Sequence, residues 1–249
     1  MNIKRSIKLR IFFAMILSSL MMIVHAENFC IARNGQTATI IVDSNDWTGV
    51  IRAAQDLGDD VRKVCGTGSP VVLTHGDASS GNIIVGTIGN SNLIDKLIRQ
   101  KKIDVKNVRG QWESYLIDVV DGQLVIAGSD KRGTIYGIYE ISQRIGVSPW
   151  YWWADVPVKH QNEVIYNSGR ILQPSPKVKY RGIFINDEWP SFGTWCNNQF
   201  GGINSKAYTH IFELLLRLKA NYLWPAMWDS RFNEDDAESP RLADEYGIV

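Results

Sequence analysis

Two adjacent carboxylates beside several tryptophans are the residues of this sequence best suited to chemistry. In RGIFINDEWPSFGTW, Asp187 and Glu188 follow a short apolar segment, and Trp189 and Trp195 come within seven residues of Glu188. A carboxylate at the end of a buried strand costs free energy unless it is hydrogen-bonded or paired, so the pair indicates a binding or catalytic task. Carboxyl groups that transfer protons, next to aromatic faces that stack on sugar rings, are typical of glycoside hydrolysis.

A second group of such residues follows in the segment NYLWPAMWD, which carries Trp224 and Trp228 and ends at Asp229. Packing in a core is the competing role for both tryptophans. We favour ligand contact for Trp228 and core packing for Trp224. The two groups together give the candidate substrate-binding residues Asn186, Asp187, Glu188, Trp224, Trp228 and Asp229.

Neighbouring residues on an extended strand face opposite sides, so one of Asp187 and Glu188 must point away from any ligand. We expect one of them to contact a ligand, and the sequence leaves open which one. Capping a loop, or pairing with Arg181, is the competing role for either carboxylate, and exposed ion pairs contribute little stability.

Strands that run in parallel are needed to bring these residues together. After a linker at 173–177, the pattern predicts strands over 178–186 and 221–229, an apolar helix over 205–220 and a further helix from 239. Alternating buried strands and helices indicate parallel β/α units, whose strand carboxyl ends share one face. A (β/α)8 barrel needs about 250 residues, so we expect only the first units of a truncated TIM barrel. The rival, a small open α/β domain, would leave the helix around 208–218 with little to cover it.

The residues before the linker predict a separate accessory α/β sandwich domain. Buried strands are expected over 38–43, 70–76 and 82–89, with helices over 44–66, 91–103 and 130–147 and a hairpin turn at Asp121-Gly122. The Ser/Asn/Asp cluster at 44–46, Ser91 and Asp130 are expected to cap these three helices. The segment GTIGNSN lacks the glycines and lysine of a phosphate loop, so its glycines indicate a strand-to-helix turn. The resulting organisation is a signal peptide over 1–26, the accessory domain over 27–170 and the start of the catalytic barrel over 171–249, with the tryptophans of 150–153 at the domain interface.

Charge and targeting signals point to an exported protein that does not bind nucleic acid. The 27 basic and 26 acidic residues nearly cancel, which excludes the basic field that nucleic acid requires. The basic residues of 4–10 and the apolar run after them predict a signal peptide cleaved after Ala26, hence a periplasmic or extracellular protein; an uncleaved anchor is the alternative. In that compartment Cys30 and Cys65 could pair and leave Cys196 single, or all three could be buried thiols. The histidines are isolated and no CxxC spacing occurs, so no metal site is expected.

Three segments resemble the glycoside hydrolase family 115 α-glucuronidases, which act on xylan. GSDKRGTIYGIYEISQRIGVSPWYWWADVPV is similar to the end of that family's accessory domain, KYRGIFINDEWPSFGTW to its first barrel strand and loop, and NYLWPAMWD to its second strand. The first segment is shared more loosely with other exoglycosidases, including the hexosaminidases. The resemblance implies inverting hydrolysis, without a cofactor, that releases glucuronic acid or 4-O-methylglucuronic acid from glucuronoxylan or xylo-oligosaccharides.

The same resemblance implies that Asp187 or Glu188 binds the uronic acid and that Trp228 lines the pocket. It places the main acid and base beyond Val249, so the catalytic residues are unknown and this chain alone is expected to be inactive. An inverting pair is separated by about 6.5 to 9.5 Å, so the adjacent Asp187 and Glu188 are not that pair. The alternative functions are an exported carbohydrate-binding or scaffold module without catalysis and another exoglycosidase of hexosaminidase-like organisation. The oligomeric state is open, with a homodimer as one option.

Overall fold

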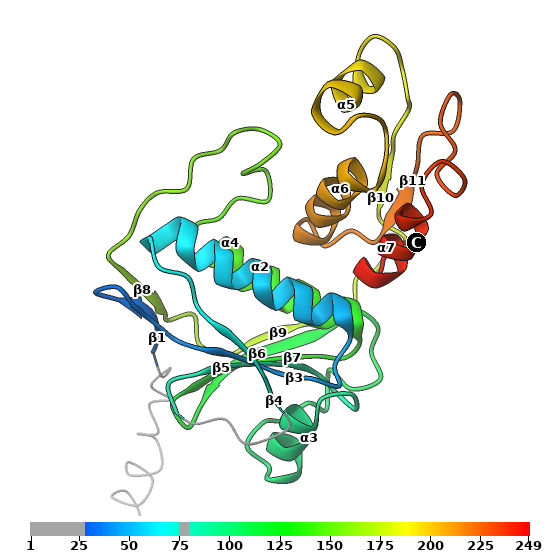
Figure 1. Cartoon of the computed structure of the whole chain (residues 1–249). Coiled ribbons are helices and arrows are strands. Elements are labelled where there is room, and N and C mark those ends of the chain that lie inside the picture. The colour runs from blue at the N-terminus through cyan, green and yellow to red at the C-terminus, as the bar shows by residue number, and fades with distance from the viewer. Residues whose placement is uncertain (1–27, 75–79) are drawn as a thin grey trace, which may run out of the picture.

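The computed structural model describes residues 28–74 and 80–249. The predicted signal peptide and its cleavage site lie outside the described residues, as does His75. Within the described ranges, no helix is long and apolar enough to cross a membrane. The chain is a mixed α/β structure in which a larger part built on a six-stranded sheet contacts a smaller part built on two strands (Figure 1).

The six-stranded sheet has the order β4-β3-β5-β7-β6-β9. Strands β4, β3, β5 and β7 run in parallel, whereas β6 pairs antiparallel with both β7 and β9. The bounds are β3 (Ile40–Asp43), β4 (Val71–Thr74), β5 (Ile83–Thr87), β6 (Tyr115–Val120), β7 (Gln123–Gly128) and β9 (Ile171–Gln173). The predicted hairpin turn is confirmed: Asp121 and Gly122 have φ of 53° and 70° between β6 and β7, the conformation of a tight hairpin turn.

Three helices cover the two faces of this sheet. Helices α2 (Thr48–Cys65) and α4 (Lys131–Arg144) lie on one face, and α3 (Asn92–Arg99) lies on the other (Figure 1). The predicted caps of α3 and α4 are confirmed, since Ser91 Oγ accepts a hydrogen bond from Ile94 N at 3.5 Å and Asp130 Oδ1 accepts one from Gly133 N at 2.7 Å. The segment after β5 is the expected strand-to-helix turn.

Several sequence-based expectations need correction in this part. Strand β4 was expected to be buried, but it is an edge strand whose Val72 and Leu73 are exposed. Helix α2 begins after Trp47, without a side-chain cap from the preceding Ser/Asn/Asp cluster. Residues 171–173, assigned above to the barrel, form β9 and extend the first sheet. The sequence did not predict a second sheet, which consists of β1 (Phe29–Arg33), β2 (Gln36–Thr37) and β8 (Glu163–Tyr166). These strands are too short to show a clear alternation of apolar and polar residues.

The smaller part contains two strands and three helices. Strands β10 (Gly182–Phe184) and β11 (Tyr222–Trp224) pair in parallel, as expected, with α5 (Phe192–Phe200) and α6 (Ser205–Arg217) between them and α7 (Glu238–Tyr246) after them. Helix α5, which carries Asn197 and Asn198, was not predicted, because its residues include Gly193 and lack a side-chain cap. The apolar side of α6 packs in one continuous core with α4, so neighbouring elements cover the helix that the small-domain alternative was expected to leave bare.

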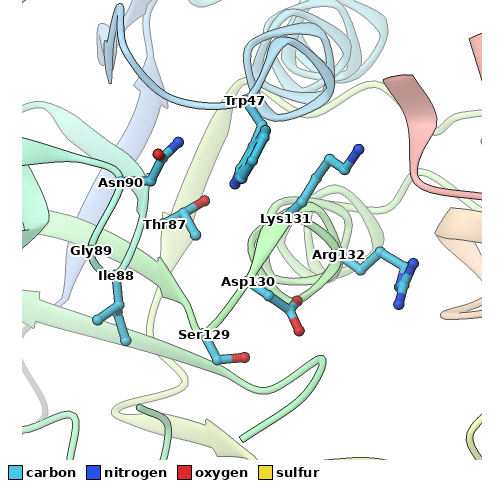
Figure 2. A pocket seen from close by; sticks show the side chains of 9 residues that line it. All are labelled: Trp47, Thr87, Ile88, Gly89, Asn90, Ser129, Asp130, Lys131 and Arg132. Carbon is cyan, nitrogen blue, oxygen red and sulfur yellow. The ribbon is translucent and has the colours of Figure 1, made fainter. Parts of the chain in front are cut away.

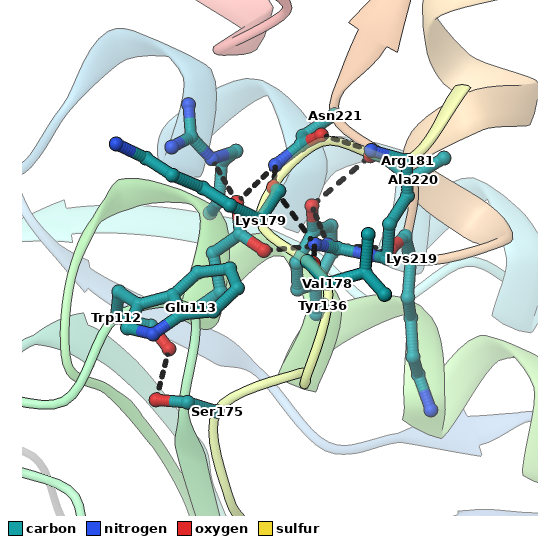
Figure 3. A network of polar contacts seen from close by, with 12 residues as sticks. Trp112, Glu113, Tyr136, Ser175, Val178, Lys179, Arg181, Lys219, Ala220 and Asn221 are labelled. Atoms are coloured by element: carbon teal, nitrogen blue, oxygen red, sulfur yellow. Dashed lines mark hydrogen bonds and ion pairs between the residues drawn. The ribbon is translucent and has the colours of Figure 1, made fainter. Parts of the chain in front are cut away.

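A buried polar cluster, which we call the joint, fixes where β10 and β11 start (Figure 3). It consists of Glu113, Arg132, Arg181 and Asn221. The Glu113 carboxylate, fully buried, accepts hydrogen bonds from Arg132 Nε at 2.5 Å, Arg181 Nη2 at 2.5 Å and Asn221 Nδ2 at 2.6 Å. Arg181 immediately precedes β10 and Asn221 immediately precedes β11, and Arg181 N donates to Asn221 Oδ1 at 2.9 Å. One carboxylate of the larger part therefore anchors both strands of the smaller part. The alternative that Arg181 pairs with Asp187 or Glu188 is wrong.

Gly58 in α2 provides a test of the packing between helix and sheet. Glycine to alanine normally stabilises a helix, but a Cβ at Gly58 would lie 2.5 Å from the Ser69 carbonyl oxygen, which is backbone and cannot rotate away. We expect Gly58→Ala to lower the free energy of unfolding by about 1–3 kcal/mol, measured by urea denaturation. Gln55→Ala, an exposed position on the same helix, is the matched control and should be neutral or stabilising. A stabilised Gly58→Ala variant would contradict this packing.

Candidate functional site

The candidate site lies at the shared edge formed by the carboxyl ends of β10 and β11. The two strands pair in register, Phe184 opposite Trp224, and Ile185 N donates to Trp224 O at 2.9 Å. Asn186, Asp187 and Glu188 follow the first strand, while Trp228 and Asp229 follow the second. The six predicted residues therefore lie on or directly after two adjacent strands, a group that we call the rim (Asn186, Asp187, Glu188, Trp224, Trp228 and Asp229).

Asp187 is buried and holds the loop after β11. Only 2% of the residue is exposed, and its Oδ2 accepts hydrogen bonds from the backbone N atoms of Trp228, Asp229 and Ser230 at 3.1, 2.6 and 2.8 Å. Ser230 Oγ donates a fourth at 3.0 Å. Burial raises the pKa of Asp187. The hydrogen bonds from Ser230 and Asp229 together lower it by more than burial raises it, so the pKa lies below the ordinary value. Asp187 therefore caps the loop after β11, which is the structural role weighed above.

Glu188 has the opposite environment. Its side chain is exposed, and Oε1 accepts a hydrogen bond from Asn186 Nδ2 at 3.0 Å. Asn186 Oδ1 in turn accepts one from Asp187 N at 3.1 Å. The two carboxylates therefore differ in accessibility: Glu188 is exposed to solvent, whereas Asp187 is enclosed by the neighbouring loop.

The tryptophans of the rim are exposed. Trp228 is 76% exposed and Trp224 is 50% exposed, with its Nε1 2.9 Å from Met227 Sδ and its ring edge-on to Phe184 at 5.5 Å. In this chain half of the Trp224 surface is therefore open, and its expected role in a barrel core stays a prediction. Strand β10, expected to be buried, is also exposed along its length, because no described element covers the Ile183 and Phe184 side chains.

A cluster of aromatic rings joins α5, α6 and the 150–153 segment. Trp195 of α5 lies 6.2 Å from Trp152 and 5.5 Å from Trp153, while Trp152 stacks on His210 of α6 at 3.8 Å between ring centroids. Trp153 Nε1 donates to His210 O at 3.1 Å. The 150–153 segment thus contacts the smaller part, as expected for Trp152 and Trp153. Trp150, in contrast, is 45% exposed.

Sequence reasoning missed one residue that contacts the rim, Ser230. Its backbone and hydroxyl both donate to Asp187, and the only sequence signal is that a serine follows Asp229. In the described part of the chain, no group of three or more His, Cys, Asp or Glu side chains could hold a metal ion. Cys30, Cys65 and Cys196 are free, with Cys30 exposed and Cys196 buried, where burial raises the pKa of its thiol to about 11.

Comparison with known proteins identifies the family. The model of Glycosyl hydrolase family 115 matches residues 173–249, which include the rim. A solved family 115 4-O-methyl-α-glucuronidase, with specificity for decorated arabinogalactans, is 37% identical over 89% of this chain, with a TM-score of 0.76. The chain belongs to glycoside hydrolase family 115.

Other comparisons define the extent of the likeness. This family 115 chain spans 29% of the length of that glucuronidase. The chitobiase of Flavobacterium johnsoniae has a TM-score of 0.54 at 14% identity, over 90% of this chain and 32% of the chitobiase, which shows a shared fold alone. No curated protein sequence matches the chain.

Proposed function

We propose that this chain forms the amino-terminal part of an inverting glycoside hydrolase that releases glucuronic acid or 4-O-methylglucuronic acid side chains from a plant polysaccharide. The 37% identity over 89% of the chain to a 4-O-methyl-α-glucuronidase carries the proposal. Glucuronoxylan and its oligosaccharides are the substrates proposed from the sequence. Because the similar enzyme is described as specific for decorated arabinogalactans, that polymer is the second candidate.

The proposal includes a domain organisation and a location. Residues 27–170 form the accessory sandwich domain, and the parallel β10–β11 pair with α6 and α7 forms the first units of a (β/α)8 barrel. The exposed face of β10 supports this assignment, since a barrel strand needs apolar neighbours on both faces. The signal sequence directs the protein to the periplasm or outside the cell, and the main acid and base belong to later strands.

In this proposal Glu188 binds the uronic acid or its linked sugar, and Trp228 offers a face to the ring. Glu188 is the carboxylate that the rim leaves accessible, held by Asn186, and Trp228 has 76% of its surface free. Asp187 acts through the loop that it holds and is a positioning residue. A carboxylate that accepts hydrogen bonds and an aromatic face that stacks on a ring together suit a sugar with several hydroxyl donors.

The test measures the release of uronic acid from glucuronoxylan and from decorated arabinogalactan. Two samples are compared, the full protein that the gene encodes and the 249-residue chain. Glu188→Gln should lower kcat/KM by about 10- to 100-fold, which corresponds to the loss of one charge-assisted hydrogen bond. Glu234→Gln is the matched control, because Glu234 is an exposed carboxylate that pairs with Arg231 and does not belong to the rim. Unchanged kcat/KM in Glu188→Gln would remove Glu188 from the site.

A second function, a carbohydrate-binding module without catalysis, is favoured by one observation, the exposure of Trp224 and Trp228 in the chain as it stands. Polysaccharide binding without any release of uronic acid, by either protein, would replace the enzyme proposal with this one.

A further inference from the structure

A second depression lies at the carboxyl-end edge of the six-stranded sheet and shares no lining residue with the rim (Figure 2). Strands β3, β5 and β7 are parallel neighbours, so their carboxyl ends open onto one edge. The chain leaves β3 for α2 on one face and leaves β5 for α3 on the other. Connections that diverge between two neighbouring strands leave a crevice at their carboxyl ends, where open α/β sheets bind ligands.

The size of the depression suits a small ligand. Its volume is about 420 Å³, within the range of small-molecule sites. Its walls come from the segment after each of the three strands: Trp47 after β3, Asn90 after β5, and Ser129 with Lys131 after β7. Figure 2 shows the indole of Trp47 facing the space between the β5 and β7 segments.

Trp47 has no packing reason for its position. It is 48% exposed, belongs to neither apolar core of the described chain and contributes no side-chain cap to α2. Lys131 Nζ lies 5.6 Å from its ring centroid, a weak cation–π contact. The indole of Trp47 is half exposed at the wall of the depression. Such an aromatic ring offers a flat apolar surface on which a sugar ring can stack.

A buried carboxylate holds Trp47 and Asn90 in place without a ligand. Asp46 is 6% exposed; its Oδ1 accepts hydrogen bonds from Trp47 N at 2.8 Å and from Asn90 Nδ2 at 3.4 Å, and its Oδ2 accepts one from Thr87 N at 2.7 Å. Asn90 Nδ2 also donates to Asn45 O at 3.2 Å. The two walls of the depression are therefore fixed to each other, which reduces the ordering cost of binding.

The polar groups of the lining point to an uncharged ligand. Asp130 brings a negative charge and Lys131 a positive one, while the charge of Arg132 is paired with Glu113. The Asn90 amide oxygen supplies an acceptor. The Ser129 hydroxyl, whose oxygen accepts from Ser114 N at 3.0 Å, can still donate its proton, and Lys131 Nζ, which donates to Asp244 O at 2.6 Å, keeps two further N–H donors. A ligand with a ring face and several hydroxyl groups matches this mixture better than an anion does. We propose that this depression binds a neutral pyranose of a polysaccharide, stacked on Trp47 with its hydroxyls toward Asn90 and Lys131.

The proposal is tested by calorimetric titration of the 249-residue chain with xylobiose, methyl β-D-galactopyranoside and D-glucuronic acid. We expect at least one neutral sugar to bind with a dissociation constant on the order of 1 mM, and glucuronic acid to bind at least fivefold more weakly. Trp47→Ala should weaken neutral-sugar binding about tenfold and Asn90→Ala about threefold. Trp150→Ala is the matched control, since Trp150 is 45% exposed and lies outside the depression, and should change affinity less than twofold.

Folding and binding are separated by two further measurements. Circular dichroism should show all three variants folded, because Asp46 bonds to the backbone of Trp47 and not to its indole. In the unsubstituted chain, the indole N–H resonance of Trp47, assigned by its loss in Trp47→Ala, should shift on addition of the neutral sugar. Three results would overturn the proposal: no neutral-sugar binding up to roughly 20 mM, equal affinities of Trp47→Ala and the unsubstituted chain, or tighter binding of glucuronic acid than of either neutral sugar.

Discussion

Glu113→Ala is expected to cost about 3–5 kcal/mol of folding free energy, the largest effect of any single substitution considered for this chain. The substitution leaves the cations of Arg132 and Arg181 and the amide of Asn221 without their common acceptor. Removing one partner of a buried ion pair leaves the desolvation cost of the others uncompensated. Here that loss is partial, because Arg181 keeps its bonds to Lys219 O and Arg132 its bond to Gly247 O. Chemical denaturation followed by far-ultraviolet circular dichroism measures the loss.

The control for this experiment is another glutamate–arginine pair with a different environment. Glu163 pairs with Arg33, but the two side chains are 44% and 56% exposed. Glu163→Ala should therefore change the free energy of unfolding by less than about 0.5 kcal/mol. If Glu113→Ala costs less than about 1 kcal/mol, the joint does not hold the strands and the position of the rim must depend on the apolar contacts of α6 instead.

The second large effect is expected for Asp187→Ala. The substitution leaves three backbone N–H groups and the Ser230 hydroxyl without an acceptor. We expect a loss of about 2–3 kcal/mol and faster amide hydrogen exchange at Trp228, Asp229 and Ser230, measured by nuclear magnetic resonance. Asp229→Ala removes an exposed carboxylate from the same loop and should leave both quantities nearly unchanged.

The effect of Asp187 depends on pH in a defined direction. Because the pKa of Asp187 is lower in the folded chain than the ordinary value, its contribution to stability is present above the unfolded-state pKa of about 3.9 and is lost as the pH falls through the folded value. The difference in unfolding free energy between the unsubstituted chain and Asp187→Ala should be constant near neutral pH and shrink below about pH 4. A difference that grows on acidification would contradict the hydrogen-bonding of Asp187.

The sequence predicted elements whose determinants are local. The caps at Ser91 and Asp130, the Asp121-Gly122 turn and the parallel order of β10 and β11 each follow from a few adjacent residues or from a repeated strand and helix pattern. The six residues of the rim were grouped together for the same reason, since each lies in one of two strand-end segments. Ser230 was missed because a single serine after a strand carries no distinctive signal.

The parts that the sequence did not predict depend on distant contacts. Nothing adjacent to Glu113 marks it as important, because its partners Arg181 and Asn221 are 68 and 108 residues away. The roles of Asp187 and Glu188 could not be separated for a related reason. Only the position of the loop after β11 shows which carboxylate is enclosed, and that loop is 41 or more residues away in the chain.

The continuous core has a consequence for how this chain folds. The apolar cluster that begins at β1 and α2 includes the buried side of α6 and ends at Tyr246 and Ile248, without a break at the proline-containing linker. The linker therefore separates two sequence patterns but not two cooperative units. Unfolding of either part exposes the core of the other, so the two parts should unfold in one transition. A substitution that destabilises the sheet should therefore lower the fraction of molecules with a folded rim, without changing the geometry of the rim in the molecules that stay folded.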